Sequence, residues 1–515
     1  MNGGEFALAA TLAVPAAGAA VVALVPARAD RAGRLLGTAF AAVGFVVSLL
    51  LYIGSRGWST PRPAQAGVSA VQPWHELDLT WVPGLDLRFH LGVDGLSYPL
   101  VVLTTLLTLL CCAYTVWRTP GARPGRALVA LLLVIEVGIL GTFLALDLVL
   151  FFVFFEVVLL PMYAVIAGWG GDGSGAGDSR PHRAAARKFA LYTLFGSVLL
   201  LVGVFTVISA AGTADIVALT GGAGMSRPVQ LAAFVLLAVA FAVKSPLWPL
   251  HTWLPDAHTQ APTVGSVILA GVLLKMGTYG LIRVAVGVAP EGARWAAPVL
   301  GVLAVAAIII GSLVCLAQVE LKRLIAYSSV GHMGFVLLGI ATLTATGIQA
   351  ALIGNIAHGV ITGLLFFLAG AVKDRFHTGA LDALGGLRER MPFLSGLLGY
   401  AAIASLGLPG LAGFWGEAFA VVAALRRGGP LWTTLAVLAA LGGALTAAYF
   451  LRLLRRVTHG PASPVVTAAD CRGIAGVEAV AWAPLVVLAL AVGLVPALVL
   501  GLAGAPVQAL VEVVR

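Results

Sequence analysis

The chain has 515 residues, of which 60% are hydrophobic and 10% are charged, and its mean hydropathy is +1.02. An average soluble domain carries about 25% charged residues, so this composition excludes an ordinary soluble protein. The formal net charge of +9 is compatible with a nucleic-acid partner only if the basic residues cluster, and their distribution argues otherwise.

Apolar runs of about 20 residues follow one another along nearly the whole chain, and each can cross a hydrocarbon core of about 30 Å as a helix. The predicted fold class is therefore all-α, a polytopic membrane bundle of about 14 transmembrane helices. The first run lacks a basic leader and a cleavage site, so we expect a retained helix and not a signal peptide. The predicted spans begin near Glu5, Leu35, Ser97, Ala127, Leu148, Phe189, Val229, Val264, Ala296, Ile325, Gln349, Phe393, Leu431 and Val477.

The basic residues gather in alternate loops. With both termini placed outside, the inside loops hold 20 of the 31 Lys and Arg residues, and the outside segments and span ends hold nine. This excess fits the positive-inside rule for an even number of helices. The positive charge therefore reports membrane topology, and we expect a lipid bilayer and no nucleic acid as partner.

The four cysteines show no CxxC motif and no Cys/His spacing typical of a metal site. This pattern argues against an iron–sulfur, haem or zinc site within the chain. We therefore expect no metal and no cofactor here, and any electron transfer belongs to other chains.

Two predicted spans are interrupted by helix-breaking residues. Lys244, in the seventh span, is followed at once by Ser-Pro, and the run SLGLPGLAGFWGE in the twelfth span ends at Glu417. Broken helices in matching positions of two halves indicate a transporter site near the midplane, because unwound backbone is tolerated there only where protein or water satisfies it. We therefore predict two broken helices and inverted five-helix repeats, over spans 4–8 and 9–13.

These repeats divide the chain into four predicted segments. The first holds three helices and an outside loop, over about residues 56–98, that we expect to be an ordered cover. The two five-helix repeats follow, and then a last segment with an inside loop and the final helix. Their bounds are 1–126, 127–290, 291–456 and 457–515.

Seven ionisable residues within the spans are candidates for proton transfer: Glu136, Glu156, Lys244, Lys275, His332, His358 and Glu417. A charge at the bilayer centre costs about 2.5–3.5 kcal/mol even on the insertion scale, so each needs a reason. Counting from the span ends places all but Glu136 near the midplane. We therefore predict a lateral row that relays protons, with Glu156 as the partner of Lys244.

The choice of lysine supports proton transfer. Only five of the 31 basic residues are lysines, and two of these five, Lys244 and Lys275, lie within spans, where no arginine is near a centre. Arginine stays charged at any accessible pH, whereas a buried lysine can release its proton. The alternative interpretation is structural, since a Lys–Glu pair or a neutral histidine can tie helices together. Glu136 is either a second acid near Glu156 or a helix-packing acid.

Three segments carry a resemblance to a known family: LALDLVLFFVFFEVVLLPMY around Glu156, KSPLWPLHTWLPDAHTQAPTVGSVILAGVLLKMGTYG from Lys244 through Lys275, and ELKRLIAYSSVGHMGF around His332. The chain resembles, from Gly92 to about Arg456, the proton-translocating antiporter-like subunits shared by complex I and multisubunit cation/proton antiporters. Glu417, where sister subunits usually carry lysine, and the HTWLPDAHTQAPT segment resemble the M-type branch.

This resemblance implies roles for the candidate residues. Glu156 and Lys244 would modulate the input side, and Lys275 and His332 would form a central relay. His358 would connect them, and Glu417 would be the terminal acid toward an outside half-channel.

The resemblance also implies a biological setting. It is that of a proton-translocating membrane subunit of bacterial NADH:quinone oxidoreductase in the plasma membrane, beside L-type and N-type antiporter-like subunits. NADH, FMN, iron–sulfur clusters and quinone would be bound by partner subunits. A sodium/proton antiporter subunit, a membrane scaffold and a membrane-bound hydrogenase subunit remain alternatives.

Overall fold

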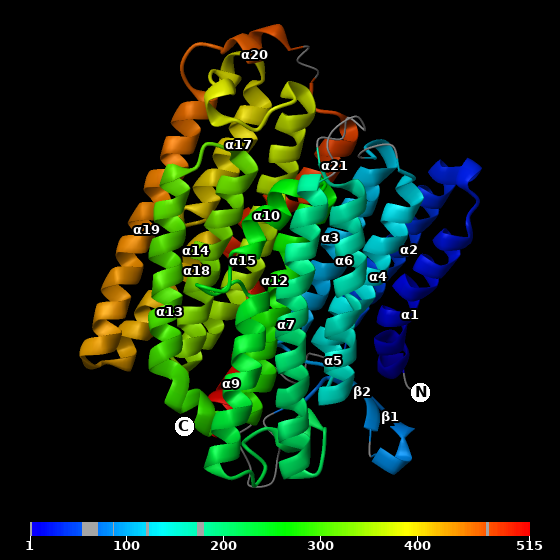
Figure 1. Ribbon diagram of the computed structural model, residues 1–515, viewed down its shortest axis with the longest axis vertical. Helices are drawn as coiled ribbons and strands as arrows, with labels where there is room; N and C mark the ends of the chain where they lie inside the picture. Colours follow the sequence, from blue (N-terminus) through cyan, green and yellow to red (C-terminus); the bar gives the residue numbers. More distant parts are fainter. Residues whose placement is uncertain are drawn as a thin grey trace.

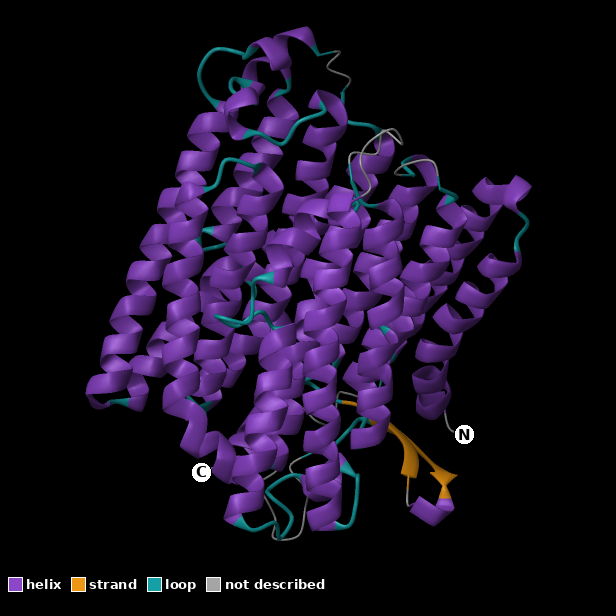
Figure 2. Cartoon of the chain, viewed as in Figure 1, coloured by secondary structure: helices purple, strands orange, loops and turns teal. Residues whose placement is uncertain are grey.

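The computed structural model describes residues 3–53, 71–85, 87–119, 123–171, 180–469 and 473–514, and these form an elongated bundle of helices (Figures 1 and 2). The helices of the first half are α1 (Gly3–Leu24), α2 (Asp30–Leu50), α3 (Tyr98–Trp117), α4 (Gly125–Leu144), α5 (Leu148–Val157), α6 (Leu159–Trp169), α7 (Arg180–Ala211), α8 (Ile216–Leu219), α9 (Arg227–Lys244), α10 (Trp253–Gln260), α11 (Thr263–Ile268), η4 (Leu269–Leu273), α12 (Leu274–Gly280) and η5 (Leu281–Val286). Those of the second half are α13 (Pro290–Ala317), α14 (Leu321–Ala341), α15 (Ala345–Phe376), α16 (Leu387–Arg390), α17 (Pro392–Ser405), α18 (Gly413–Arg427), α19 (Gly429–Thr458), α20 (Pro464–Ala468), α21 (Gly476–Leu494) and α22 (Ala497–Val514).

Helices at the centre of the bundle are buried, and those at its two ends expose apolar surface. The span formed by α11, η4, α12 and η5 is wholly buried, and α14 and α15 are nearly so. By contrast, α1 and α2 at one end of the bundle and α19 at the other expose much of their apolar surface (Figure 1). Since lipid or a neighbouring membrane subunit is the natural cover for such faces, the arrangement fits a membrane bundle.

Fourteen helical segments of the described residues are long and apolar enough to cross a membrane, which agrees with the predicted number. The helical segments of the structure differ from the predicted spans in two places. The predicted twelfth span is split into α17 and α18, each too short to qualify alone, and α22 is an additional long apolar helix beyond the predicted last span.

The helix α22 lies at the outer ends of other elements. The side chain of Arg294, at the start of α13, donates to the Val514 carbonyl at 3.0 Å, and Leu502 lies against Gly95 just before α3. These contacts place α22 on the side of the bundle where α1 begins (Figure 1). The helix α22 therefore covers the outer ends of other helices. Counting apolar runs cannot show this, because a helix that lies over helix ends can be as apolar as one that crosses the membrane.

Both predicted helix breaks are present. The first separates α9, which ends at Lys244, from α10, and the second separates α17 from α18. In the second break Gly407 and Gly410 have φ of +81° and +92°, a backbone conformation that glycine adopts without steric cost. The breaks therefore set Lys244 at one helix end and Glu417 in the second turn of a new helix.

A two-stranded hairpin lies in the connection between α2 and α3 of this helical bundle. Strand β1 (His75–Val82) pairs antiparallel with β2 (Leu87–Val93), after the 3-10 turn η3 (Pro83–Leu85). It lies at the outer face near the start of α1 (Figure 2). Residues 56–70 and residue 86 of the predicted outside cover lie outside the described residues, so the hairpin belongs to the described part of that cover.

A buried ion pair ties the eighth span to the start of α3. The Arg283 guanidinium contacts the Asp94 carboxylate, and both side chains are 4% exposed. Asp94 also accepts the backbone N–H groups of Leu96 and Ser97, at 3.0 and 3.1 Å. Arg283 in addition donates to the Tyr279 hydroxyl at 3.3 Å. Because every charge here has partners, the pair can be kept in a buried position.

Candidate functional site

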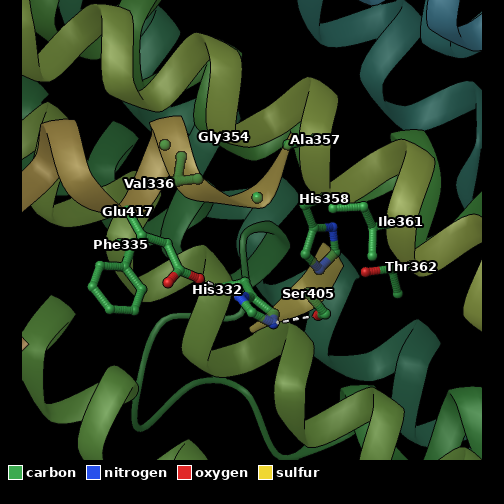
Figure 3. A pocket seen from close by; sticks show the side chains of 12 residues that line it. His332, Phe335, Val336, Gly354, Ala357, His358, Ile361, Thr362, Ser405 and Glu417 are labelled. Atoms are coloured by element: carbon green, nitrogen blue, oxygen red, sulfur yellow. Dashed lines mark hydrogen bonds and ion pairs between the residues drawn. The ribbon is translucent and has the colours of Figure 1, made fainter. Parts of the chain in front are cut away.

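Four of the seven predicted residues lie next to one another in the buried centre of the bundle. The Lys275 ammonium lies 2.6 Å from His358 Nδ1, and His332 Nδ1 lies 2.7 Å from Glu417 Oε1. The two histidine rings lie edge to face, 6.0 Å apart between centroids (Figure 3). These side chains come from α12, α15, α14 and α18, so the fold brings together residues that span 143 positions of sequence. We call this set the axial row.

A local widening of the helix positions Lys275. The turn η4 is π-helical, and the Lys275 ammonium donates to the Ala270 carbonyl, five residues before it, at 2.6 Å. A π-helical turn shifts backbone hydrogen bonds and is frequent at functional sites. Lys275 is wholly buried and has the Ala270 carbonyl and His358 Nδ1 as its partners. The ammonium is therefore held by dipoles, and no ion pair with a carboxylate is found for it within the described ranges.

The two ring nitrogens of His358 differ in their surroundings. Nδ1 accepts from Lys275, whereas Nε2 is buried with no hydrogen-bond partner among the described residues. A neutral histidine that accepts at Nδ1 carries its proton at Nε2. His358 can therefore accept a proton on the lysine side and release one on the side that faces His332.

A small cavity lies between the two histidines and Glu417. Its volume is about 30 Å³, and its polar walls include Thr362 and Ser405 (Figure 3). A water molecule needs about 10–15 Å³ on this measure and two or more polar partners. The cavity can therefore hold one or two waters between His358 and His332.

The second helix break supplies both partners of His332. Ser405, the last residue of α17, lies 2.9 Å from His332 Nε2, and Glu417 of α18 bonds Nδ1 on the other side of the ring. Glu417 is 15% exposed and His332 10%. A histidine with a hydroxyl at one nitrogen and a carboxylate at the other is suited to pass a proton across its ring. Sequence analysis did not assign Ser405, although its position directly before the break was a usable signal.

Lys244 and Glu156 are near each other but not joined. No ion pair or hydrogen bond links them in the part of the chain that the structure describes; instead the Lys244 ammonium lies 4.7 Å from the centroid of the Phe155 ring. Glu156 still exerts a coulombic attraction on Lys244. The predicted partners are thus not in direct contact in this structure, and the lysine lies over an aromatic face.

Glu136 is separate from the axial row. It is wholly buried in α4, on the side that faces Gly44 of α2 and Cys112 of α3, and neither carboxyl oxygen has a hydrogen-bond partner among the described residues. Gly138, which lies against Phe154 of α5 and against Val158 just after that helix, is on a different face of α4. Glu136 therefore does not pack as a second acid beside Glu156.

His258 is a buried residue that sequence analysis left without a place in the row. Its ring stacks on Phe366 at 4.5 Å, and neither ring nitrogen has a partner among the described residues. It interacts electrostatically with Lys275 and with Lys322, the latter at the inside end of α14. His258 therefore lies between the row and the inside face.

Comparison with protein families agrees with this geometry. Residues 145–443 match the family described as NADH:quinone oxidoreductase/Mrp antiporter, TM. The chain is 40% identical to NADH-quinone oxidoreductase subunit M of Rhodobacter capsulatus, covering 97% of this chain and 95% of that protein. It is 38% identical to subunit M of Rickettsia prowazekii, over 81% of this chain and 82% of that protein.

Solved structures show the same fold. A chain of respiratory complex I from Thermus thermophilus with bound NADH superposes with a TM-score of 0.84 at 29% identity, covering 99% of this chain and 100% of that one. A chain of the Mrp complex from Dietzia sp. DQ12-45-1b gives 0.83 at 24% identity, covering 99% of each, a likeness of fold alone.

Proposed function

The chain belongs to the M subunits of bacterial NADH-quinone oxidoreductase, the antiporter-like, proton-translocating membrane subunits of complex I, and from this premise we propose that the axial row carries the protons. The observation that supports the proposal is the short run of contacts from Lys275 through His358 and His332 to Glu417. A transported proton needs donors and acceptors within hydrogen-bond reach or one water apart. The row meets this requirement with a single cavity in its middle.

The steps follow from the contacts. Lys275 gives a proton to His358 Nδ1, and His358 releases its other proton from Nε2 into the cavity. Water or the Ser405 hydroxyl passes that proton to His332 Nε2, and His332 Nδ1 passes one to Glu417. Each step breaks one N–H or O–H bond and forms another. The net result is that Lys275 loses one proton and Glu417 gains one.

The open Lys244–Glu156 arrangement supports a modulating role for this pair. If Glu156 moves against Lys244, the carboxylate stabilises the ammonium, and if it moves away, the desolvated lysine releases its proton. A change of this kind at the input side alters the positive charge near Lys275. A movement of Glu156 relative to Lys244 would be the way in which electron transfer in other subunits affects the protonation of the row.

The remaining assignments concern the rest of the complex. NADH, FMN, iron–sulfur clusters and quinone are bound by partner subunits, and the neighbours in the membrane are L-type and N-type antiporter-like subunits. Within this chain, residues 127–290 and 291–456 are the two inverted repeats, between the segments 1–126 and 457–515. The matched helix breaks after Lys244 and before Glu417 support this division.

Replacing Glu417 with glutamine tests the terminal acid. Glutamine keeps the size and can accept the His332 hydrogen bond, but it cannot take up a proton. We expect proton pumping to be lost in inside-out vesicles while the assembled complex retains NADH oxidation with an artificial acceptor. Glu417→Asp, which keeps the acid, should retain part of the pumping, and full pumping in Glu417→Gln would refute the assignment.

Replacing Lys244 with methionine tests the modulating pair. The apolar isostere retains the contact with Phe155 and removes the charge that Glu156 attracts. We expect impaired pumping and slower coupled quinone reduction, measured together in vesicles. Arg455→Met, in the last turn of α19 on the inside face, is the control for loss of a basic residue, and equal pumping by the two variants would contradict a role for Lys244.

A further inference from the structure

Glu136 is a buried acid that the axial row does not use. It is 0% exposed, it lies midway along α4, and both of its carboxyl oxygens lack a partner among the described residues. An ionised carboxylate without a counter-charge in such a place would cost many kcal/mol, so the group holds a proton. A protonated acid still needs an acceptor for its O–H and a donor for its carbonyl oxygen.

The helix α2 leaves room for such a partner beside Glu136. A Cβ built on Gly44 would meet no atom closer than Glu136 Oε1, at 4.0 Å, although Gly44 is itself buried. By contrast, a Cβ on Gly37, two turns earlier in α2, would lie 2.3 Å from Val129. Gly44 therefore leaves room for a methyl-sized group, about the size of a water molecule, beside the acid, and the carboxyl oxygens can supply polar contacts to a water there.

Polar side chains continue from this space to the outer face. Ser48 lies one helical turn outward from Gly44 on the same face of α2, and its hydroxyl is 2.9 Å from the Thr105 hydroxyl of α3. Tyr52 follows one turn further out, is 43% exposed, and packs its ring 5.9 Å from that of Tyr98. We call Gly44, Ser48, Tyr52, Tyr98 and Thr105 the outer seam. Each of the two hydroxyls also has a backbone carbonyl of its own helix within reach, at 2.7 Å for Ser48 and 3.1 Å for Thr105.

We propose that Glu136 is a second proton-binding site, separate from the axial row, whose proton exchanges with the outer aqueous phase through the outer seam. Water at Gly44 accepts the carboxyl proton and returns another to the carbonyl oxygen, so the acid stays neutral. The Ser48 and Thr105 hydroxyls relay the exchange toward Tyr52. The neighbouring titratable group on α3 is Cys112, which is wholly buried.

Infrared difference spectra of the intact purified complex, recorded on exchange from H₂O to D₂O, test the proposal. The wild-type complex should show a C=O stretch of a protonated carboxylic acid that shifts in D₂O, and Glu136→Gln should lose that band. The double variant Ser48→Ala/Thr105→Val should keep the band but delay its shift. A Glu136→Gln spectrum that retains every such band, or an unchanged rate in the double variant, would overturn the proposal.

Matched variants separate this result from a general effect on packing. The double variant Thr206→Val/Ser209→Ala removes one threonine and one serine hydroxyl from α7. Both hydroxyls donate to backbone carbonyls near the surface, so the Glu136 proton of this variant should exchange at the wild-type rate. If Glu136→Gln does not assemble, Gly44→Ala decides, because its Cβ fits without a clash and fills the space for water. Slow exchange in Gly44→Ala supports the proposal, and wild-type exchange contradicts it.

Discussion

Lys275→Met is expected to abolish proton pumping and to slow coupled NADH:quinone turnover. Methionine nearly preserves the volume of this wholly buried side chain, so packing is retained while the exchangeable proton is removed. Positioned acid–base groups contribute about 10²–10⁴-fold to proton-transfer rates, and we expect a loss of at least about 10²-fold. Dye-reported acidification of inside-out vesicles, measured beside quinone reduction, gives both values.

Two further variants define what this experiment shows. Lys275→Arg keeps the positive charge but cannot release a proton, so it should fail like Lys275→Met if proton exchange is what matters. Lys188→Ala removes a half-exposed lysine that pairs with Asp256 at 2.7 Å, and it should pump normally. Normal pumping by Lys275→Met would favour a scaffold in which the buried charges only tie helices together.

Arg283→Met should produce the largest loss of stability among single substitutions at the outer face. It leaves Asp94 buried with its charge unpaired, which typically costs about 3–5 kcal/mol. The double variant Arg283→Met/Asp94→Asn removes both charges and should recover much of that loss. Native gels of solubilised membranes, together with thermal unfolding of the purified complex, measure both effects.

A solvent-exposed ion pair serves as the control for this buried pair. Arg456 lies 3.4 Å from Asp382, with the two side chains 36% and 73% exposed, and such pairs contribute about 0–1 kcal/mol. Arg456→Met should therefore leave assembly unchanged. Equal losses from Arg283→Met and Arg456→Met would mean that the buried pair has no special part in holding α3 to the eighth span.

Sequence patterns predicted the spans and pointed to the four residues of the axial row for the same physical reason. Each ionisable residue in hydrocarbon is costly, so Lys275, His332, His358 and Glu417 stand out against an apolar background. Their depth within each span followed from counting residues. That they touch depends on which helices are neighbours, and the structure brings all four together.

Features that depend on how segments fold back were not predictable. Ser405 joins the site only because the second break turns the chain beside His332, and His258 is next to the row only because α10 packs inward. Arg283 was expected at an outer span end, yet it is buried because Asp94 is brought to it by the hairpin and the start of α3. The helix α22 has the composition of a span, and only its contacts show that it lies at outer helix ends.

The depth of the axial row has an electrical consequence. Lys275, His332 and His358 lie near the midpoints of their spans, so a proton that moves among them travels parallel to the membrane plane. A charge that crosses the whole membrane works against about 2.3 kcal/mol per 100 mV, but movement in the plane crosses none of that potential. On the proposed path, transfer along the row is therefore insensitive to membrane voltage. The voltage would act on the steps that connect the row to the two faces, and those steps would do the work against the membrane potential.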